Sequence, residues 1–506
     1  MTVRDLLDQA LAHAMSPADR ENVAAWGRAL DVQCHGVTHD SRSVKPGWVF
    51  VGLRGLRADG ADFAGQAIAA GAAAVVAERS ASTTSTVPWI VVKDARLTLA
   101  WLAAVFFDHP SRQMRVVGIT GTNGKTTTSY VVSAIFEAAA VKCGLMGTVK
   151  YRIGDRDVAA ARTTPEAPEL QAMMRQMVEA GCGACAMEVS SHALTLRRAD
   201  GIHFAAGVFT NLTRDHLDFH ADMEDYFAAK RRLFEILPPD APAAINLDDP
   251  RGLAMAETAK RTITYAVNRP ADVTTGPLKF SLEGLAFDIR TPQGSFSVRS
   301  SLVGRPNVYN ILAAVTVTIA LGVPVEAVKR GVAGLHGVPG RFERVSSAAD
   351  DIAVLVDYAH TDDALRNLLE TARPLALRRL ITVFGAGGDR DRTKRPLMGM
   401  VAARLSDVVI ITSDNPRSED PQRVIDEISL GAQPETRQRD VRLLTLVDRR
   451  EAIHRAVTDA ASGDLVLIAG KGHEKYQEIE GRKLPFDDVA VAREALEARR
   501  HRVRVG

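Results

Sequence analysis

The sequence predicts an α/β fold of three domains: a small N-terminal α/β domain, a central domain with a mainly parallel sheet, and a C-terminal Rossmann-like doubly wound domain. Apolar segments that end in polar residues alternate with segments of helical spacing, which is typical of buried parallel strands and their crossover helices. One such strand runs into a glycine-rich turn followed by a helix. The length of 506 residues suits about three domains.

The N-terminal domain is expected to span residues 1–110. Residues 48–53 and 72–78 are rich in apolar side chains and predict strands, and the segment 60–72 has helical spacing. Pro110 interrupts the pattern that follows, and we place the first boundary there.

The central domain is expected to span residues 111–338. After a first strand and its glycine-rich turn, three apolar segments end in polar residues, at 183–191, 203–212 and 242–250. In parallel sheets the functional side chains gather at the carboxyl ends of such strands. The segment 270–300 alternates between apolar and polar residues and contains turn signals, which predicts an antiparallel patch.

The C-terminal domain is expected to span residues 339–506, because the glycine-rich segment 334–345 marks a second boundary. Beyond it, five strand-like segments are each followed by helical spacing, which predicts a doubly wound sheet. These segments are 352–360, 379–391, 407–417, 441–448 and 464–474.

Composition restricts the class of protein. Apolar residues make up 46% of the chain and charged residues 25%, and the formal net charge is +2. This near-balance of charge gives no support for the basic patch that a nucleic-acid-binding protein needs, so we expect no nucleic-acid partner. The longest apolar run, 67–77, is too short and too rich in alanine and glycine for a membrane span. The N-terminus lacks the apolar core of a secretory signal, and we expect a cytoplasmic protein.

The four cysteines are Cys34, Cys143, Cys182 and Cys185. They are too few for a disulfide framework in a chain of this length, which favours a reducing compartment. Cys182 and Cys185 form a Cys-x-x-Cys pair, which is compatible with a redox or zinc site. No second cysteine pair or nearby histidine pair completes a zinc set, and the sequence favours buried, inert thiols.

The segment 116–130, VVGITGTNGKTTTSY, predicts a phosphate-binding loop between a strand and a helix. Ile119 occupies the position where the common form of this loop has its first glycine. Gly121 and Gly124 allow the backbone to approach a phosphate closely. Lys125 is expected to neutralise the β- and γ-phosphates, and the Thr126 hydroxyl to bind Mg²⁺. The alternative is a glycine turn with a surface lysine.

In this setting the motif GTNGKTTT resembles the Mur ligase family, the ATP-dependent amide-forming enzymes of peptidoglycan synthesis, to which folylpolyglutamate synthase is related. The resemblance also explains why Ile119 stands at the position of the usual first glycine, because this family has its own variant of the loop. The resemblance covers almost the whole chain and implies a P-loop-type ATPase domain at the centre. It implies ATP contacts from Gly121, Thr122, Asn123, Gly124, Lys125, Thr126, Thr127, Asn307, Asn310, Arg341, Asp357 and His360.

The same resemblance implies Mg²⁺ as cofactor. Glu188 and His216 each follow a predicted strand end and match metal-contacting positions of the family, beside Thr126. Lys230 lies in a helical segment and matches a lysine that reacts with CO₂ to form a carbamate, which then binds a second Mg²⁺. Burial near cations favours the neutral amine that this reaction needs. Lys125, His216 and Lys230 are therefore the expected catalytic residues. Judged without the family, Glu188 is a helix cap, His216 a loop residue and Lys230 a solvated surface group.

Several segments resemble the family's contacts to a UDP-sugar peptide. Trp48, Arg162 and Leu196 depart from the usual residues in these segments. For any single hydroxyl among the matching positions, helix capping is an equally good explanation. The implied contacts are Ser41, Leu56, Arg57 and Ala58 for the UDP-sugar, and Thr163, Thr164, Ser190 and Arg198 for its peptide part.

The motif SDNPR matches the form that the family associates with meso-diaminopimelate. Diaminopimelate ends in an ammonium and a carboxylate, whereas lysine ends in an ammonium alone. Arg417 is expected to hold the distal carboxylate through a bidentate pair and to repel the ammonium of lysine. Glu474 is expected to accept from the substrate's ammonium. The full implied set is Arg390, Asp414, Asn415, Pro416, Arg417, Gly470 and Glu474, and the plain alternative is a proline turn with a surface arginine.

The resemblance implies a ligase that adds meso-diaminopimelate to the D-Glu γ-carboxylate of UDP-MurNAc-L-Ala-D-Glu through an acyl phosphate. Its partners are these two substrates and ATP, with no membrane insertion, and it is expected to be a monomer. The alternatives are another Mur-type ligase, for example one for L-lysine, a folylpolyglutamate-synthase-like ligase, a P-loop NTPase that hydrolyses ATP without an amino acid, and a non-catalytic nucleotide-binding module.

Overall fold

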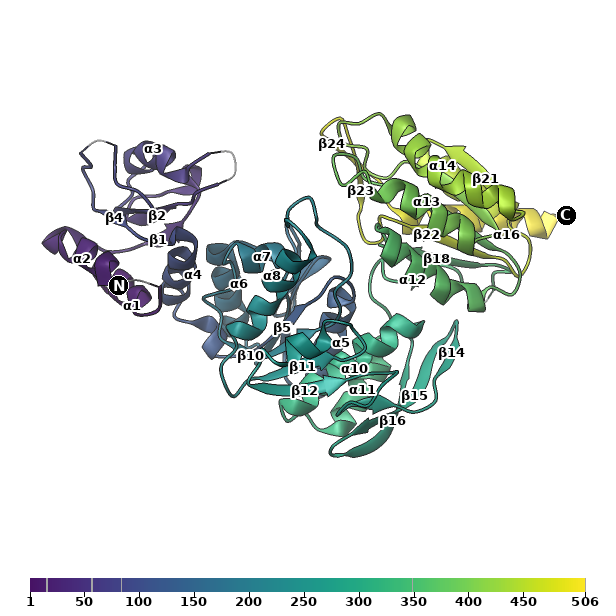
Figure 1. Ribbon diagram of the computed structural model, residues 1–506, viewed down its shortest axis with the longest axis horizontal. Coiled ribbons are helices and arrows are strands. Elements are labelled where there is room, and N and C mark those ends of the chain that lie inside the picture. Colours follow the sequence, from purple (N-terminus) through teal and green to yellow (C-terminus); the bar gives the residue numbers. More distant parts are fainter. Residues whose placement is uncertain (15–16, 56–57, 83, 348, 506) are drawn as a thin grey trace.

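The computed structural model describes residues 1–14, 17–55, 58–82, 84–347 and 349–505. Figure 1 shows three α/β units that follow one another along the chain, with the first and the third on opposite sides of the second. The predicted fold class is confirmed: each unit has its own largely parallel sheet with helices packed against it.

The N-terminal unit has a parallel sheet in the order β1-β2-β3-β4, and its core joins α1 and α4 to the inner side chains of these strands. The predicted strands at 48–53 and 72–78 are β2 and β3, and the segment between them contains the expected helix. The elements are α1 (Val3–Ala14), α2 (Pro17–Ala24), β1 (Gly36–Thr38), β2 (Trp48–Gly52), α3 (Ala64–Ala69), β3 (Ala74–Ala77), β4 (Trp89–Val91) and α4 (Ala95–Phe106).

The central unit has an eight-stranded sheet in the order β12-β11-β10-β5-β9-β6-β7-β8. All pairings from β12 to β6 are parallel, and β7 and β8 add an antiparallel hairpin at the edge. The strands are β5 (Arg115–Thr120), β6 (Cys143–Met146), β7 (Lys150–Ile153), β8 (Arg156–Ala159), β9 (Ala184–Glu188), β10 (Phe204–Phe209), β11 (Pro242–Asn246) and β12 (Arg261–Tyr265).

Helices cover both faces of this sheet. One hydrophobic core lies between the sheet and the helices α5, α10 and α11, and a second lies on the other face under α6 and α8. The helices are α5 (Lys125–Ala138), α6 (Ala167–Glu179), α7 (Ser191–Thr195), α8 (Met223–Glu235), α9 (Gly252–Ala256), α10 (Arg305–Ala320) and α11 (Val325–Gly334).

The antiparallel patch predicted at 270–300 is present. It is a small sheet in which β15 pairs with β13, β14 and β16, always antiparallel. Its inner residues complete the core around α10 and α11. The strands are β13 (Thr274–Thr275), β14 (Lys279–Ser281), β15 (Gly284–Thr291) and β16 (Gly294–Ser300).

The C-terminal unit has a six-stranded sheet in the order β17-β18-β22-β19-β20-β21, so the five predicted strands are all present, and the chain's last parallel strand lies in the middle. The strands are β17 (Glu343–Arg344), β18 (Ala353–Asp357), β19 (Leu380–Phe384), β20 (Val408–Thr412), β21 (Arg442–Leu446) and β22 (Leu465–Ala469), with a separate hairpin of β23 (Tyr476–Ile479) and β24 (Arg482–Pro485).

The helices of this unit lie on both faces of its sheet, as a doubly wound fold requires. One core contains α12, α13 and α14, and the other contains α15 and α16 (Figure 1). The bounds are α12 (Asp362–Ala372), α13 (Lys394–Leu405), α14 (Pro421–Gln438), α15 (Arg449–Asp459) and α16 (Asp488–Val505).

Candidate active site

The predicted phosphate loop connects β5 to α5 and has a backbone that only glycine can supply. Gly124, directly before α5, has a φ of 85°, and a Cβ atom there would lie 2.3 Å from Asn310 Oδ1. Gly121 has a φ of 149°, and a Cβ atom there would lie 1.9 Å from Thr210 Oγ1. The loop therefore has a tight turn at the positive end of a helix, where a phosphate can approach the backbone closely, although the amides of Thr122 and Asn123 already donate to Asn211.

Two lysines converge on one carbonyl of this loop. Lys125 Nζ donates to the oxygens of Gly121 and Thr122, each at 2.8 Å, and Lys230 Nζ donates to Gly121 O at 2.9 Å. Burial lowers the pKa of Lys125 and brings that of Lys230 well below its usual value, with the charge of Lys125 as a further cause. The partly buried ammonium of Lys125 can attract an anion, and its charge together with burial favours the neutral amine at Lys230.

Oxygen atoms gather beside the loop. Thr126 Oγ1 donates to Glu188 Oε2 at 3.1 Å. Thr148 binds the same carboxylate through its amide, 2.8 Å from Oε1, and through its hydroxyl, 3.0 Å from Oε2. Glu188 ends β9, the neighbour of β5, and is 1% exposed. A carboxylate and a hydroxyl beside a phosphate loop are the oxygen donors that Mg²⁺ prefers, so these two residues fit the ion that the sequence predicts.

His216 lies in the loop after β10, in the left-handed region with a φ of 55°. Its ring nitrogen Nε2 is 3.5 Å from Asp215 Oδ2, and its ring is 4.9 Å from that of His192. Burial lowers its pKa to about 3, helped by the charges of Lys125 and Lys230. The imidazole is therefore neutral at physiological pH and keeps a lone pair for a ligand. Among the described residues, no three His, Cys, Asp or Glu side chains form a ready metal cluster.

The other predicted ATP contacts surround the loop from two domains. Asn307 and Asn310 lie on α10, and the amide of Asn310 donates to Asn307 Oδ1 at 2.9 Å. Asp357 ends β18 and accepts from the amide of Phe342 at 2.7 Å, while burial raises its pKa. His360 contacts the carbonyl of Tyr358 at 2.9 Å, and Thr127 is buried in the first turn of α5.

Contacts between the central and C-terminal units reach the loop itself. Arg341 Nη2 donates to Thr126 Oγ1 at 3.2 Å, and Asn123 Nδ2 donates to Asp363 Oδ2 at 3.2 Å. Arg341 also lies over the ring of Tyr358, 4.6 Å from its centroid. The sequence places Arg341 at the boundary between two domains, and the structure brings its guanidinium to the phosphate loop.

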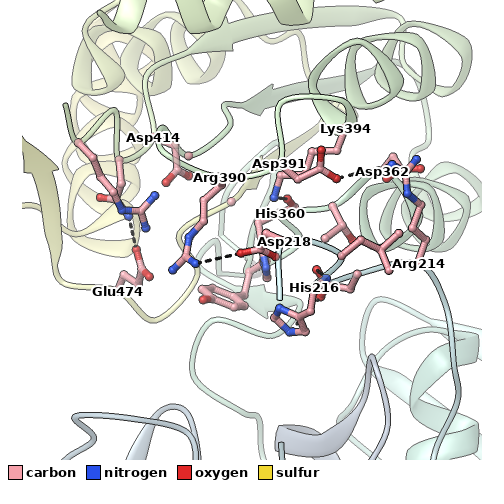
Figure 2. A pocket seen from close by; sticks show the side chains of 18 of the residues that line it. Arg214, His216, Asp218, His360, Asp362, Arg390, Asp391, Lys394, Asp414 and Glu474 are labelled. Atoms are coloured by element: carbon pink, nitrogen blue, oxygen red, sulfur yellow. Dashed lines mark hydrogen bonds and ion pairs between the residues drawn. The ribbon is translucent and has the colours of Figure 1, made fainter. Parts of the chain in front are cut away.

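A cavity of about 350 Å³ separates the two units beside the loop. Figure 2 shows Arg390 reaching toward Asp218, 3.6 Å away, from the opposite wall of the cavity. The central unit contributes Thr163, His192, Arg214, Asp215, His216, Leu217 and Asp218 to the lining, and the C-terminal unit contributes residues that include His360, Gly387, Arg390, Lys394, Asp414, Asn415, Arg417, Gly470 and Glu474.

The predicted diaminopimelate residues meet at the C-terminal wall of this cavity, except Pro416, which is not part of the lining. Arg417 has a φ of 53° and donates through Nη1 to the carbonyl of Gly388 at 2.5 Å. Asn415 Nδ2 donates to Glu474 Oε2 at 2.8 Å. Asp414 Oδ2 is buried and has no hydrogen-bond partner among the residues that the structure describes. These residues of the wall therefore combine two guanidinium groups, an amide and two carboxylates.

The residues predicted to contact the peptide part of the UDP-substrate also form one group. Thr164 Oγ1 donates to Glu188 O at 2.9 Å and lies 3.4 Å from Ser190 Oγ. Ser190 caps α7 by accepting from the amide of Ala193 at 3.2 Å, so the capping explanation holds for this hydroxyl. Arg198 donates to Thr164 O at 3.1 Å. Thr163 Oγ1 lies 3.1 Å from the hydroxyl of Thr148 and lines the cavity.

The predicted UDP-sugar contacts lie in the N-terminal unit, away from this cavity. Ser41 is 9% exposed and donates to Gln66 Oε1 at 2.9 Å. The carbonyl of Ala58 accepts from the amide of Gly55 at 2.9 Å. Leu56 and Arg57 lie outside the described residues.

The structure adds cavity residues that sequence reasoning missed. Arg214, Asp215 and Asp218 follow β10 in the motif TRDHLD, where only His216 was selected. Lys394 begins α13 and donates to the carbonyl of His360 at 2.9 Å. The dense charge of the motif after a strand end was an available signal for the first three. For Lys394 there was none, because a lysine in a polar segment is usually solvated.

All four cysteines are free and buried, as the sequence predicts. Burial raises the pKa of each, that of Cys143 to about 12. Over the described part of the chain, no helix is long and apolar enough to cross a bilayer.

A glycine-rich loop with two lysines on one of its carbonyls, facing a wall of charged residues in another domain, is typical of a nucleotide-dependent enzyme with a second substrate. Family models match along the chain: the Mur ligase family catalytic domain at residues 33–107, the Mur ligase middle domain at 119–318, and the Mur ligase glutamate ligase domain at 340–472. The chain belongs to the Mur ligase family.

Similar proteins of known name cover nearly the whole chain. A UDP-N-acetylmuramoyl-L-alanyl-D-glutamate--2,6-diaminopimelate ligase of Gloeobacter violaceus is 49% identical over 93% of this chain and 96% of its own. The ligase of the same name from Solibacter usitatus is 47% identical over 91% of this chain and 93% of its own. A solved structure of a ligase with this name has a TM-score of 0.68 at 36% identity, over 93% of this chain and 96% of that chain.

Proposed function

We propose that this chain is an ATP-dependent ligase that joins meso-diaminopimelate to the D-Glu γ-carboxylate of UDP-MurNAc-L-Ala-D-Glu. The observation that carries the proposal is one cavity with the phosphate loop's neighbours on one wall and the SDNPR residues on the other. The names of relatives at 43–49% identity support the substrate pair. A nucleotide-activated carboxyl group and an incoming amine would meet in this cavity.

The reaction begins with transfer of the γ-phosphoryl group to the carboxylate. Lys125 would offset the charge on the transferring group from within the loop, and Arg341 would reach the same phosphates from the C-terminal domain. Mg²⁺ would supply Lewis-acid charge when bound to oxygens of Thr126 and Glu188, with His216 beside them. The family's acyl-phosphate route needs no covalent intermediate on a side chain of the enzyme.

Lys230 would act as a carbamate. Its ammonium form is disfavoured by burial and by the charge of Lys125, so the amine is available to attack CO₂. The nitrogen forms a bond to carbon, the amine loses one proton, and the product is an anion. That anion would offset the positive charge of Lys125, which contacts the same Gly121 carbonyl, and provide oxygens for a second Mg²⁺.

The amine of diaminopimelate would then attack the acyl phosphate and expel inorganic phosphate. Arg417 would bind the distal carboxylate, and Glu474 the distal ammonium, while Arg390 would exchange its contact with Asp218 for the substrate. Closure of the domains positions amine and carbonyl, and this positioning is a main part of the catalysis.

The remaining parts of the proposal concern the whole molecule. We assign residues 1–110 to the UDP-sugar, 111–338 to ATP and 339–506 to the amino acid. Ser41 and Ala58 would contact the sugar nucleotide, together with Leu56 and Arg57. Thr163, Thr164, Ser190 and Arg198 would hold the peptide part. The enzyme would work as a monomer in the cytoplasm.

The test is inorganic phosphate release across a panel of substrates. We expect release only when ATP, Mg²⁺, UDP-MurNAc-L-Ala-D-Glu and meso-diaminopimelate are all present. Turnover with L-lysine equal to that with diaminopimelate would contradict the specificity. Activity on a folate glutamate acceptor, release without any amino acid, or nucleotide binding without release would each replace the proposal with one of the other function classes.

A further inference from the structure

A lysine lies directly behind the diaminopimelate wall, and no function has been assigned to it. Lys471 follows β22, and its side chain is 0% exposed. Its ammonium donates to Asn415 Oδ1 at 2.9 Å and to Glu474 Oε2 at 3.1 Å. Asn415 and Glu474 line the cavity, but Lys471 does not. The lysine therefore touches two pocket residues without facing the substrate itself.

Lys471 fixes the orientation of the Asn415 amide. The oxygen of this amide accepts from the lysine and also from the amide of Glu478 at 2.9 Å, and its nitrogen donates to Glu474 at 2.8 Å. A flipped amide would place its NH₂ group against an ammonium and an N–H, and its oxygen against a carboxylate. Every one of these contacts would become repulsive, so the asparagine has one stable orientation.

Lys471 also directs the carboxylate of Glu474. Both donors, Asn415 Nδ2 and Lys471 Nζ, contact the same oxygen, Oε2. The structure describes no contact of this kind for Oε1, and the side chain is 18% exposed at the cavity. One oxygen thus remains to accept from a ligand, and the second hydrogen of the Asn415 amide remains to donate to one.

We propose that Lys471 is a positioning residue that sets the polarity of this wall, so that it accepts an ammonium at Glu474 and a carboxylate at Asn415 and Arg417. The inference rests on the proposed function, because it concerns recognition of the amino acid's distal end. Lys471 also balances the charge of Glu474. Without that balance the wall would be more negative and would suit an end that carries an ammonium alone.

The decisive variant is Lys471→Met, which removes the charge and both donated hydrogen bonds at similar volume. We expect KM for meso-diaminopimelate to rise about tenfold, while KM for ATP and for the UDP-dipeptide stays within about twofold. The ratio of kcat/KM for diaminopimelate to that for L-lysine is expected to fall. Lys475→Met is the matched control, since Lys475 is 61% exposed and pairs with Asp487 at 2.6 Å.

A double-mutant cycle with Glu474→Gln separates positioning from general damage. If Lys471 acts through Glu474, adding Lys471→Met to Glu474→Gln should cost little more than Glu474→Gln alone. Lys471→Arg keeps the charge and the donors, so it should retain more of the diaminopimelate preference than Lys471→Met. Thermal unfolding shows whether each variant is folded. If Lys471→Met does not fold, Lys471→Arg is compared with the wild-type enzyme instead.

Two outcomes would overturn the inference: an unchanged KM and unchanged discrimination in Lys471→Met, or full additivity with Glu474→Gln. Both presuppose a wild-type enzyme that depends on diaminopimelate. If the wild-type protein itself shows no such dependence, the proposed function has failed, and the experiment distinguishes the two failures.

Discussion

The phosphate loop and the diaminopimelate wall, which is the C-terminal side of the cavity with Asn415, Arg417 and Glu474, differ in how their charges are arranged. At the loop, the ammonium of Lys125 and the amine of Lys230 both donate to the carbonyl of Gly121, and among the described residues no carboxylate forms an ion pair with either of them. At the wall, Lys471 is matched by Glu474, and Arg417 by Glu478 at 3.4 Å. An excess of one sign attracts any anion of suitable size, whereas a balanced arrangement selects a ligand by the placement of its charges.

This difference predicts different failures. Removing a cation from the loop should reduce the rate of the reaction, because the developing charge on phosphate loses a partner. Removing one at the wall should change which amino acid is used, with a smaller effect on ATP. The four predictions that follow are ordered from the largest expected effect to the smallest.

Lys125→Met should be the most damaging change. The loss of its charge from the loop is expected to reduce kcat by roughly 10²–10³, as for other preorganised charge partners. Steady-state phosphate release measures it. Lys142→Met is the control, because Lys142 is at the surface in a pair with Asp155 at 2.7 Å. If Lys125→Met kept the wild-type kcat, the proposed role of this lysine in phosphoryl transfer would be wrong.

Lys230→Met should lower kcat by roughly 10–100-fold, because the enzyme would lose the carbamate and its oxygens. In the wild-type protein, ¹³C-labelled bicarbonate should give a carbamate signal by NMR, and this signal should be missing from the variant. A fully active wild-type enzyme with no labelled carbamate would leave Lys230 as a buried amine and disprove the modification.

Arg417→Ala should raise KM for meso-diaminopimelate about tenfold and leave KM for ATP nearly unchanged, because a charged hydrogen-bond pair to the distal carboxylate is lost. Discrimination against L-lysine should weaken in the same variant. Arg423→Ala is a suitable control, since Arg423 is 65% exposed on α14. If KM for ATP rose instead, the two regions would not be separate in function.

The smallest effect concerns a place where the two domains meet. His473 lies beside the backbone of Thr148, and burial together with the charge of Arg341 lowers its pKa to about 3 from 6.5. The folded protein therefore binds fewer protons than the unfolded chain between these values. The contribution of the neutral His473 to the free energy of unfolding is therefore fully present above pH 6.5. It is lost progressively as the pH decreases toward 3.

Thermal unfolding as a function of pH tests this prediction. His473→Asn should reduce the loss of melting temperature between pH 6.5 and pH 4, while other buried histidines such as His192 still contribute. His454→Asn, at a partly exposed position on α15, should keep the wild-type slope. An identical slope in His473→Asn would show that this contact does not sense pH.

The sequence alone was sufficient to predict many of the strands and to place part of the candidate site. Glu188 could be placed beside the loop because neighbouring parallel strands end at one edge, and β9 does pair with β5. The five C-terminal strands were recognisable because each is a short apolar run with polar residues after it. Apolar periodicity is a local property, and these features depend only on local patterns.

Other features depend on pairings between distant segments. The strand β22 lies between β18 and β19, and this order brings Glu474 to Asn415. Nothing in the local pattern of either segment specifies that neighbour. Lys471 was missed for the same reason: a lysine in a glycine-rich turn is usually solvated, and only the folded pocket reveals that it is buried.

The buried thiols offer a way to follow unfolding of single domains. Cys34 belongs to the N-terminal core, while Cys143, Cys182 and Cys185 belong to the central cores. Thiolates react with alkylating reagents, and a thiol with a raised pKa inside a core reacts only when that core opens. Alkylation rates measured separately for Cys34 and Cys185 would therefore give the opening rates of two domains of the unmodified enzyme. Comparing these rates with and without nucleotide would reveal which of the two domains the ligand stabilises.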